Sequence, residues 1–243
     1  MDLKDKTALV TGGGSGIGMG IALALAREGC RTAISGRNKE KLRVAAATFT
    51  GQPAILTRTC DVSDREQVNR LVAWVIERLG RLDIVVNSAG INIVKRGMHE
   101  LDPAEFDRIM AVNCTGFFNV VHAVLPGMRE QKNGLIVNVS SIAGKRAIPL
   151  AGAAYCASKF AATAIGTAVG LEERLHGIRV TNVYPGEVNT ALLDERPEPV
   201  SEDKRGKMVQ PEDIAECIVA IAKLPPCVSV PELVIRPVYQ EYL

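Results

Sequence analysis

A tyrosine and a lysine four residues apart, in the segment YCASKF at 155–160, are the residues of this sequence best suited to proton transfer. In a helix, positions i and i+4 lie on one face, so Tyr155 and Lys159 would present their polar ends to the same space. A free phenol has a pKa of about 10 and is a poor acid–base catalyst at neutral pH, whereas a fixed ammonium nearby favours the phenolate and lowers that pKa. The same spacing also occurs in ordinary solvated pairs, so its significance depends on what else reaches the site.

A glycine-rich segment, TGGGSGIG at 11–18, is the second group of residues with a chemical use. It follows the apolar run TALVT and opens a helical pattern, MGIALALAREG. Glycines at such a turn let the backbone approach a pyrophosphate, and the free N–H groups of a helix N-terminus favour its negative charge. The spacing fits TGxxxGxG and no register of GxGxxG; a tight turn is the alternative, but the place between strand and helix favours a dinucleotide. The candidate cofactor contacts here are Gly12, Gly14, Ser15, Gly16, Ile17 and Gly18.

The end of the next apolar run indicates which dinucleotide binds. A carboxylate there would accept hydrogen bonds from the adenosine ribose, whereas an arginine would accommodate a 2′-phosphate. The sequence reads SGRNKEK, with Arg37 at this point and no carboxylate before Glu40. This favours NADP(H) over NAD(H), the alternative being that Arg37 is a solvated residue at the start of a helix.

Seven short runs rich in β-branched residues alternate with longer segments of helical period, such as the apolar spacing within 68–79. The runs are almost continuously apolar, as strands buried on both faces must be. The sequence therefore predicts an α/β fold: a Rossmann-type doubly wound parallel sheet of about seven strands with helices on both faces. The predicted strands are TALVT, TAISG, AILTRTCDV, LDIVVNSAG, GLIVNVSS, IRVTNVYPG and ELVIRPV.

Composition and charge limit the classes of function. The chain has 243 residues, 47% apolar and 23% charged, with a net charge of +2, so it can bury a core without metals or disulfides. These values favour a single dinucleotide-binding and catalytic domain over 1–243. No basic block points to nucleic acid, and the N-terminus contains neither a signal-peptide core nor a membrane span. Six scattered cysteines without a CxxC pair indicate free thiols in a reducing compartment, so we expect a cytoplasmic protein without a metal site.

The one break in composition is the charged segment 190–209, which contains two prolines. It follows the predicted strand IRVTNVYPG, whose carboxyl end should border the ligand crevice. We expect it to form a lid over the substrate, and a mobile surface loop is the alternative.

These segments resemble, in order, the motifs of the classical short-chain dehydrogenase/reductase family along essentially the whole chain. After TGGGSGIG come CDV, NSAG, VNCTG, NVSSIAG, YCASK and YPGEVNT. The resemblance implies that Tyr155 exchanges the substrate proton, Ser141 hydrogen-bonds the carbonyl oxygen and Lys159 binds the nicotinamide ribose and tunes Tyr155. It also implies that Asn113 holds a water linking Lys159 to solvent. Independently of the family, hydride arriving at a carbonyl carbon builds negative charge on oxygen, which such donors stabilise.

The resemblance implies further cofactor contacts beyond the glycine-rich segment. The residue after the third strand, Asp61, would contact the adenine, the NSAG segment would pack along the adenosine ribose, and the YPGEVNT segment would hold the nicotinamide. Ser88 stands where the family more often has a second asparagine. The implied contacts are Asp61, Val62, Asn87, Ala89, Gly90, Pro185, Gly186, Val188 and Thr190, together with Tyr155 and Lys159.

The substrate is predicted from weaker signals. The stretch from QPEDIAE to the C-terminus is similar to the ends of NADP-dependent 3-hydroxy-acid dehydrogenases, the branch that includes serine dehydrogenases. A small hydroxy acid needs a cation for its carboxylate, and Lys145 and Arg146 follow the strand that delivers Ser141, although a solvated turn explains them equally well. Glu187 would repel an anion if it pointed inward. The candidate substrate contacts are Ser141, Arg146 and Glu187.

The favoured function is an NADP(H)-dependent carbonyl reductase or alcohol dehydrogenase for a small molecule, with a 3-hydroxy acid as the favoured substrate. A 3-oxoacyl carrier-protein reductase shares all the catalytic motifs, and a sensor that holds NADP(H) without turnover is the non-enzyme alternative. Nucleic acids and membranes are not expected partners. The family resemblance implies a homodimer or homotetramer, paired through helices near 103–130 and 155–175.

Overall fold

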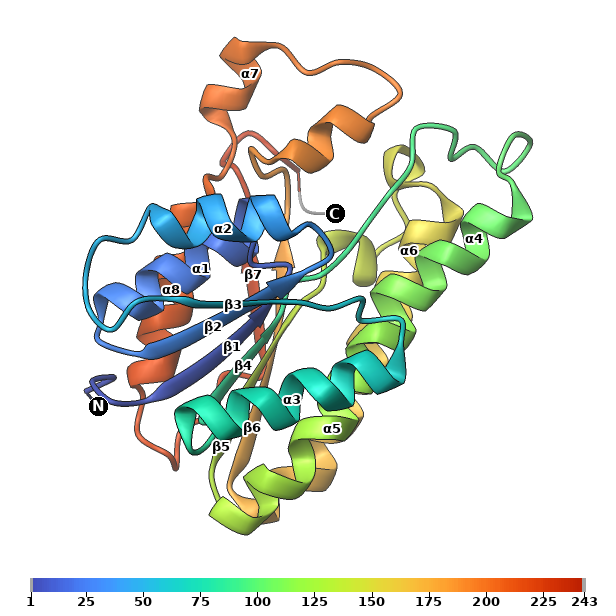
Figure 1. The fold of residues 1–243 in the computed structure, drawn as a ribbon. Coiled ribbons are helices and arrows are strands. Elements are labelled where there is room, and N and C mark those ends of the chain that lie inside the picture. Colours follow the sequence, from blue (N-terminus) through green and yellow to red (C-terminus); the bar gives the residue numbers. More distant parts are fainter. Residues whose placement is uncertain (1, 242–243) are drawn as a thin grey trace.

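The computed structural model describes residues 2–241 and contains one seven-stranded parallel sheet with helices on both faces (Figure 1). The strand order is β3-β2-β1-β4-β5-β6-β7. The strands are β1 (Thr7–Thr11), β2 (Arg31–Gly36), β3 (Leu56–Thr59), β4 (Ile84–Asn87), β5 (Gly134–Val139), β6 (Ile178–Pro185) and β7 (Glu232–Ile235). The α-helices are α1 (Gly16–Arg27), α2 (Lys39–Ala47), α3 (Arg65–Leu79), α4 (Pro103–Met110), α5 (Gly116–Gln131), α6 (Ala153–Glu173), α7 (Glu202–Lys207) and α8 (Pro211–Lys223). The predicted fold class is confirmed, and each predicted run coincides with one strand.

Two apolar layers hold the sheet between its helices. On one face α1 and α8 pack together, with Ile21 and Ile214 in the same buried cluster. On the other face α3 and α5 cover the sheet, and Val75 and Val124 belong to a second buried cluster. The central strands β1, β4 and β5 are buried at every residue, whereas the edge strands β3 and β7 alternate with exposed positions. Burial on both faces explains why the central runs are continuously apolar.

The strand order switches direction at β1: β2 and β3 follow on one side of it, and β4 to β7 follow on the other. In open α/β sheets, ligands bind beside such a switch point, outside the carboxyl ends of the strands. The glycine-rich turn after β1, the segment after β4 and the turn after β5 border one hollow there. The fold therefore brings three of the predicted motifs to one edge of the sheet.

One long helix runs from Pro103 to Gln131, because α4 continues through a π-helical turn at Ala111–Thr115 into α5. Among the described residues, it is the one helix long and apolar enough, by length and composition, to cross a membrane. Half of its most apolar window is buried inside the fold, where Val112 and Val120 pack in the cluster beneath α3. Packing against the sheet accounts for this apolar character.

The segment 190–209, predicted to be a lid, has secondary structure of its own. It begins with a 3-10 turn at Ala191–Glu195 and continues to α7, and a bridge between Val188 and Val209 closes its base. Figure 1 shows it in orange, projecting above the rest of the fold at the top of the view. Leu192, Leu193 and Arg196 from this segment line a cavity beside Tyr155. Its movement over a substrate stays a prediction.

Candidate active site

Tyr155 and Lys159 lie in the first two turns of α6, beside the end of β5. Lys159 Nζ donates a hydrogen bond of 2.9 Å to the carbonyl oxygen of Val139, the last residue of β5, and lies 5.6 Å from the centre of the Tyr155 ring. Ser141, two residues beyond β5, shares a hydrogen bond with Tyr155 through its side chain. Helix α6 and strand β5 together bring the predicted tyrosine, lysine and serine to one place.

The two serines after β5 have different environments. Ser140 is buried, and its hydroxyl donates to the Lys159 carbonyl at 3.2 Å and lies 3.0 Å from the Thr163 hydroxyl. Ser141 accepts a hydrogen bond from the amide of Ala143 at 3.1 Å and borders the cavity with Tyr155. Ser140 therefore anchors α6 to the strand end, and Ser141 is the serine placed to meet a substrate.

Burial raises the pKa of Tyr155 to about 12, although the hydrogen bond with Ser141 and the charge of Arg96 act in the opposite direction. Burial also lowers the pKa of Lys159 to about 8. The expectation that Lys159 lowers the tyrosine pKa is thus not met: removing the phenolate from water outweighs the Ser141 hydrogen bond and the charge of Arg96, and Lys159 is not among the groups that shift this pKa. At neutral pH Tyr155 is a protonated donor beside an ammonium that is still charged.

Asn113 lies in the π-helical turn of the long helix, and such turns are frequent at functional sites. Its side chain accepts from the amide of Ile91 at 2.8 Å and donates to the Ile91 carbonyl and to Ser158 Oγ, both at 3.0 Å. A Cβ added at Gly90 would lie 3.4 Å from Lys159 Nζ and 3.5 Å from Asn113 Oδ1. Asn113 therefore fixes the backbone that borders Lys159, and its predicted role in holding a water stays a prediction.

Two hollows along the carboxyl ends of β1 and β4 have the residues expected around an elongated dinucleotide. Gly12 has a φ of +67°, and a Cβ there would lie 2.8 Å from the amide nitrogen of Ala89, so a larger residue does not fit. Asn87 lies outside both linings and borders a separate, much smaller hollow with Asn113 and Lys159, and both polar atoms of its side chain are buried without a hydrogen-bond partner in the described chain. Ser15 precedes α1 and its side chain makes no capping bond. These unpartnered groups fit NAD(P)(H). The two linings include Gly12, Ser15, Gly16, Ile17, Arg37, Asp61, Val62, Ala89, Gly90, Tyr155, Lys159 and Thr190.

The remaining predicted cofactor residues are placed differently. Gly14 lies against Lys41 of α2, and a Cβ at Gly18 would lie 2.5 Å from the Gly12 carbonyl oxygen, so Gly18 permits close packing within the turn. Pro185, Gly186 and Val188 line the neighbouring cavity around Ser141 and Tyr155.

The adenosine end of this hollow borders the end of β2. Arg37 follows β2, is exposed, and makes no hydrogen bond or ion pair with any part of the described chain. Asp61 accepts from the amide and the hydroxyl of Ser63, at 2.9 and 2.6 Å, through one carboxylate oxygen, which leaves its second oxygen for a ligand. Arg37 is therefore an unpaired guanidinium at the position where the sequence predicts a 2′-phosphate.

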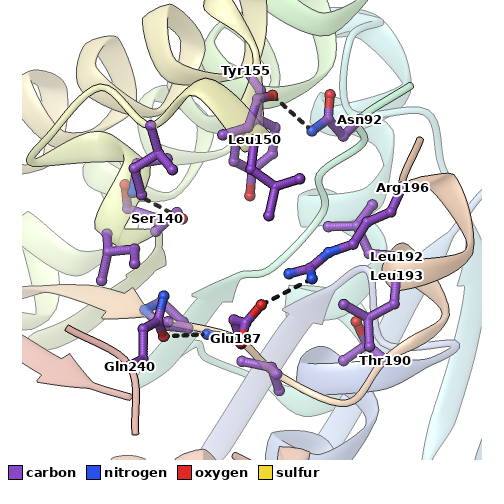
Figure 2. Close-up of a pocket in the computed structure, with 18 of the residues that line it drawn as sticks. Asn92, Ser140, Leu150, Tyr155, Glu187, Thr190, Leu192, Leu193, Arg196 and Gln240 are labelled. Atoms are coloured by element: carbon purple, nitrogen blue, oxygen red, sulfur yellow. Dashed lines mark hydrogen bonds and ion pairs between the residues drawn. The ribbon is translucent and has the colours of Figure 1, made fainter. Parts of the chain in front are cut away.

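A cavity of about 170 Å³ opens beside Tyr155 and Ser141. Figure 2 shows Tyr155 and Glu187 on opposite sides of it, with Arg196 extending from the 190–209 segment to Glu187. Apolar side chains of Ile142, Ile148, Leu150, Leu192 and Leu193 form much of the wall. A small molecule with a few polar groups would suit this lining.

Glu187 connects the 190–209 segment to the C-terminal segment through hydrogen bonds. Its carboxylate accepts from Arg196 at 2.9 Å and from Tyr239 at 2.7 Å, and Lys204 lies 3.3 Å away. Its amide donates to the side chain of Gln240 at 2.9 Å. Burial alone would raise the pKa of Glu187, but these donors outweigh it and hold the pKa below its ordinary value. The negative charge of Glu187, which was expected to repel an anionic substrate, is therefore already compensated by Arg196 and Lys204.

The two cations predicted to bind a substrate carboxylate do not line this cavity. Lys145 is paired with Glu232 at 2.5 Å and lies over the ring of Tyr184, and Arg146 is exposed. The sequence interpretation instead missed the cavity residues Asn92, Arg96, Arg196 and Gln240. Arg96 could have been considered because it follows a strand end, but nothing in the local sequence separates it from the adjacent Lys95.

The family model described as short chain dehydrogenase matches residues 6–200. The chain belongs to the short-chain dehydrogenase family. An oxidoreductase of Staphylococcus aureus (strain MW2) is 36% identical over 236 residues, which are 97% of this chain and 99% of the relative. This short-chain dehydrogenase is thus an oxidoreductase whose likeness to relatives extends over nearly its whole length.

Solved structures of the family superpose closely on this one. The alcohol dehydrogenase of the archaeon Thermococcus sibiricus, complexed with 5-hydroxy-NADP, has a TM-score of 0.88 and 32% identity, covering 98% of this chain and 99% of that one. A closed form of serine dehydrogenase complexed with NADP+ has a TM-score of 0.87 and 26% identity, covering 97% and 96%. Other similar structures hold NADPH or NADH.

The lowered pKa of Lys159 predicts a pH dependence of NADPH-driven reduction. As the pH rises through about 8, Lys159 loses its proton and charge, so kcat/KM should fall above that pH. In Lys159→Arg the guanidinium stays charged, so the residual activity should show no decline near pH 8. Steady-state profiles from pH 6 to 10 check this, and a decline near pH 8 that persists in the arginine variant would assign it to another group.

Proposed function

We propose that this short-chain dehydrogenase is an NADP(H)-dependent oxidoreductase that transfers a hydride between the nicotinamide and a carbonyl or secondary alcohol. The observation that carries the proposal is the grouping of Tyr155, Ser141 and Lys159 at the border between the predicted cofactor hollow and the cavity. A small 3-hydroxy acid, oxidised to the 3-oxo acid, is the favoured substrate.

In the direction of reduction, NADPH held in the two hollows would supply the hydride that the carbonyl carbon receives. Ser141 and Tyr155 hold the carbonyl oxygen through hydrogen bonds, and these strengthen as negative charge develops there. Tyr155, protonated at neutral pH, passes its proton to this oxygen. Lys159 places a positive charge beside the phenolate that remains, and Asn113 keeps the neighbouring 90–91 backbone in place. Oxidation of the alcohol reverses these steps.

Tyr155→Phe tests this function because it removes the proton donor and leaves the ring. Oxidation of NADPH should be screened against aldehydes, keto acids and 3-oxoacyl thioesters, alongside NADP-dependent oxidation of 3-hydroxy acids. Loss of one donor of this kind costs about a hundredfold to ten-thousandfold in rate, while NADPH binding, followed by its fluorescence, should stay nearly unchanged. Loss of NADPH binding in this variant would contradict the assigned role, and a wild-type protein that binds NADPH but reduces no carbonyl would favour the sensor.

The preference for NADP(H) over NAD(H) is supported by Arg37, an unpaired cation at the adenosine end of the hollow. Guanidinium groups bind phosphate through paired, charge-assisted hydrogen bonds. The absence of a carboxylate from the end of β2 removes the usual partner of an unmodified ribose.

Arg37→Gln should raise the KM for NADPH about tenfold and leave that for NADH within about twofold, because only the 2′-phosphate loses a charged partner. The matched control is Arg43→Gln, since Arg43 is already paired with Glu40 at 2.6 Å. Steady-state kinetics with both cofactors decide the matter. Equal losses for NADPH and NADH would show that Arg37 supports the loop and does not read the phosphate.

The carrier-protein alternative has less support from the surface near the cavity. Such a reductase needs cations to attract an acidic phosphopantetheinyl carrier. Lys145, one of the two cations after β5, is paired with Glu232. Activity on a carrier-linked thioester compared with a free hydroxy acid separates the two substrates.

A further inference from the structure

We propose that Arg96 is the specificity-determining residue of the cavity and binds an anionic group of the substrate, a carboxylate in the simplest case. The inference rests on the proposed function, since it places this anion beside the tyrosine that exchanges the substrate proton. Arg96 extends from the segment after β4, and it lines the same cavity as Tyr155, Ser141 and Glu187.

Arg96 is a buried cation: burial and the charge of Arg196 lower the pKa of its guanidinium, and the charge of Glu195 raises it. Its side chain is only 8% exposed, and no ion pair joins it to an acidic residue of the described chain. Its hydrogen bonds go to main-chain carbonyls: Nε donates to Ile93 at 2.6 Å, Nη1 to Leu150 at 3.1 Å and Nη2 to Glu195. Three of five N–H donors are thus used, and two are left. Withdrawing an unpaired charge from water is unfavourable, so a counter-ion from the ligand would stabilise this arrangement.

The other charged groups of the cavity do not supply that counter-ion. Glu187, the one carboxylate in the lining, is already held by Arg196, Lys204 and Tyr239. Among the described residues, the cavity wall therefore contains two guanidinium groups and a single carboxylate, and this carboxylate forms an ion pair with Arg196. The guanidinium that is left without an ion pair in this described wall is that of Arg96.

The position of Arg96 is fixed before any ligand arrives. Gly152, the residue before α6, has a φ of +80°, and a Cβ there would lie 2.8 Å from Arg96 Cβ. The carbonyls that orient the guanidinium come from three segments, at 93, 150 and 195. Tyr155 lies close enough for the positive charge of Arg96 to lower the pKa of its phenol. A substrate bridging Arg96 and Tyr155 would have its anionic group and its reacting oxygen at the two ends of a short molecule.

A purely structural role, in which Arg96 only ties these three segments together, makes a different prediction. It requires the hydrogen bonds to the carbonyls, but it gives the cavity no preference between an anion and a neutral molecule of the same shape. The test therefore compares butanoate with butanamide, two ligands that cannot be oxidised or reduced at a carbinol carbon. Their dissociation constants are measured by calorimetry on the full chain saturated with NADP+.

Wild type should bind butanoate about thirtyfold more tightly than butanamide, since truncating one partner of a buried charge pair typically has an effect of at least this size. Arg96→Gln should remove this preference by weakening butanoate and leaving butanamide within about threefold. Arg96→Lys keeps the charge but not the planar fork, so it should retain part of the preference. Arg70→Gln, on an exposed face of α3, is the matched control, and Arg146→Gln tests the rival cation named by the sequence. Both should keep the wild-type ratio.

Equal affinity of wild type for butanoate and butanamide would overturn the proposal even if the Arg96 variants fail to fold. A preference that survives in Arg96→Gln, or that disappears in Arg146→Gln, would also overturn it. Because neither ligand turns over, the result is independent of catalysis. A protein that discriminates between the ligands but reduces no carbonyl would refute the proposed function alone, and one that reduces neutral carbonyls without discrimination would refute this inference alone.

Discussion

The rest of the site depends on one interaction, the hydrogen bond that holds the buried ammonium of Lys159 in place. Its hydrogen bond to Val139 joins the first turns of α6 to the carboxyl end of β5, and it is the one hydrogen bond that this ammonium makes within residues 2–241. Burial lowers the pKa of this ammonium to about 8, so Lys159 is still protonated at neutral pH. A charge in this position is useful only beside a group that gains negative charge, and Tyr155 is that group.

The surrounding elements serve to hold this contact in place. The Ser140 hydroxyl donates a hydrogen bond to the Lys159 carbonyl and so connects the end of β5 to α6. Asn113, from the π-helical turn, forms hydrogen bonds with the Ile91 backbone and with Ser158. Because β1, β4 and β5 are adjacent and parallel, the cofactor turn, the 87–91 segment and Ser141 must all leave the sheet at the same edge. The chemistry thus follows from the strand order together with a small number of side chains at strand ends.

The fold and the catalytic group could be predicted because their signals are local. Strands buried on both faces read as apolar runs, and a tyrosine and a lysine one helical turn apart share a face whatever surrounds them. The cavity could not be predicted in the same way. Two of the carbonyls that accept hydrogen bonds from Arg96 belong to residues that follow it by 54 and 99 positions in the sequence. The tyrosine that donates a hydrogen bond to Glu187 follows it by 52 positions. The π-helical turn lies within an otherwise regular helical pattern, and the pKa of Tyr155 depends on burial, which spacing alone does not reveal.

Transfer of label from the cofactor tests the central claim most directly, namely that hydride passes from the nicotinamide to the carbon of a carbonyl, so that the proton is left for its oxygen. The reduction should be run with NADPH carrying deuterium in place of the transferred hydride, and separately with unlabelled NADPH in deuterium oxide, using the best carbonyl substrate. The account predicts one deuterium at the carbinol carbon in the first product and none at that carbon in the second. Deuterium from solvent at that carbon, or an unlabelled product from the labelled cofactor, would contradict it.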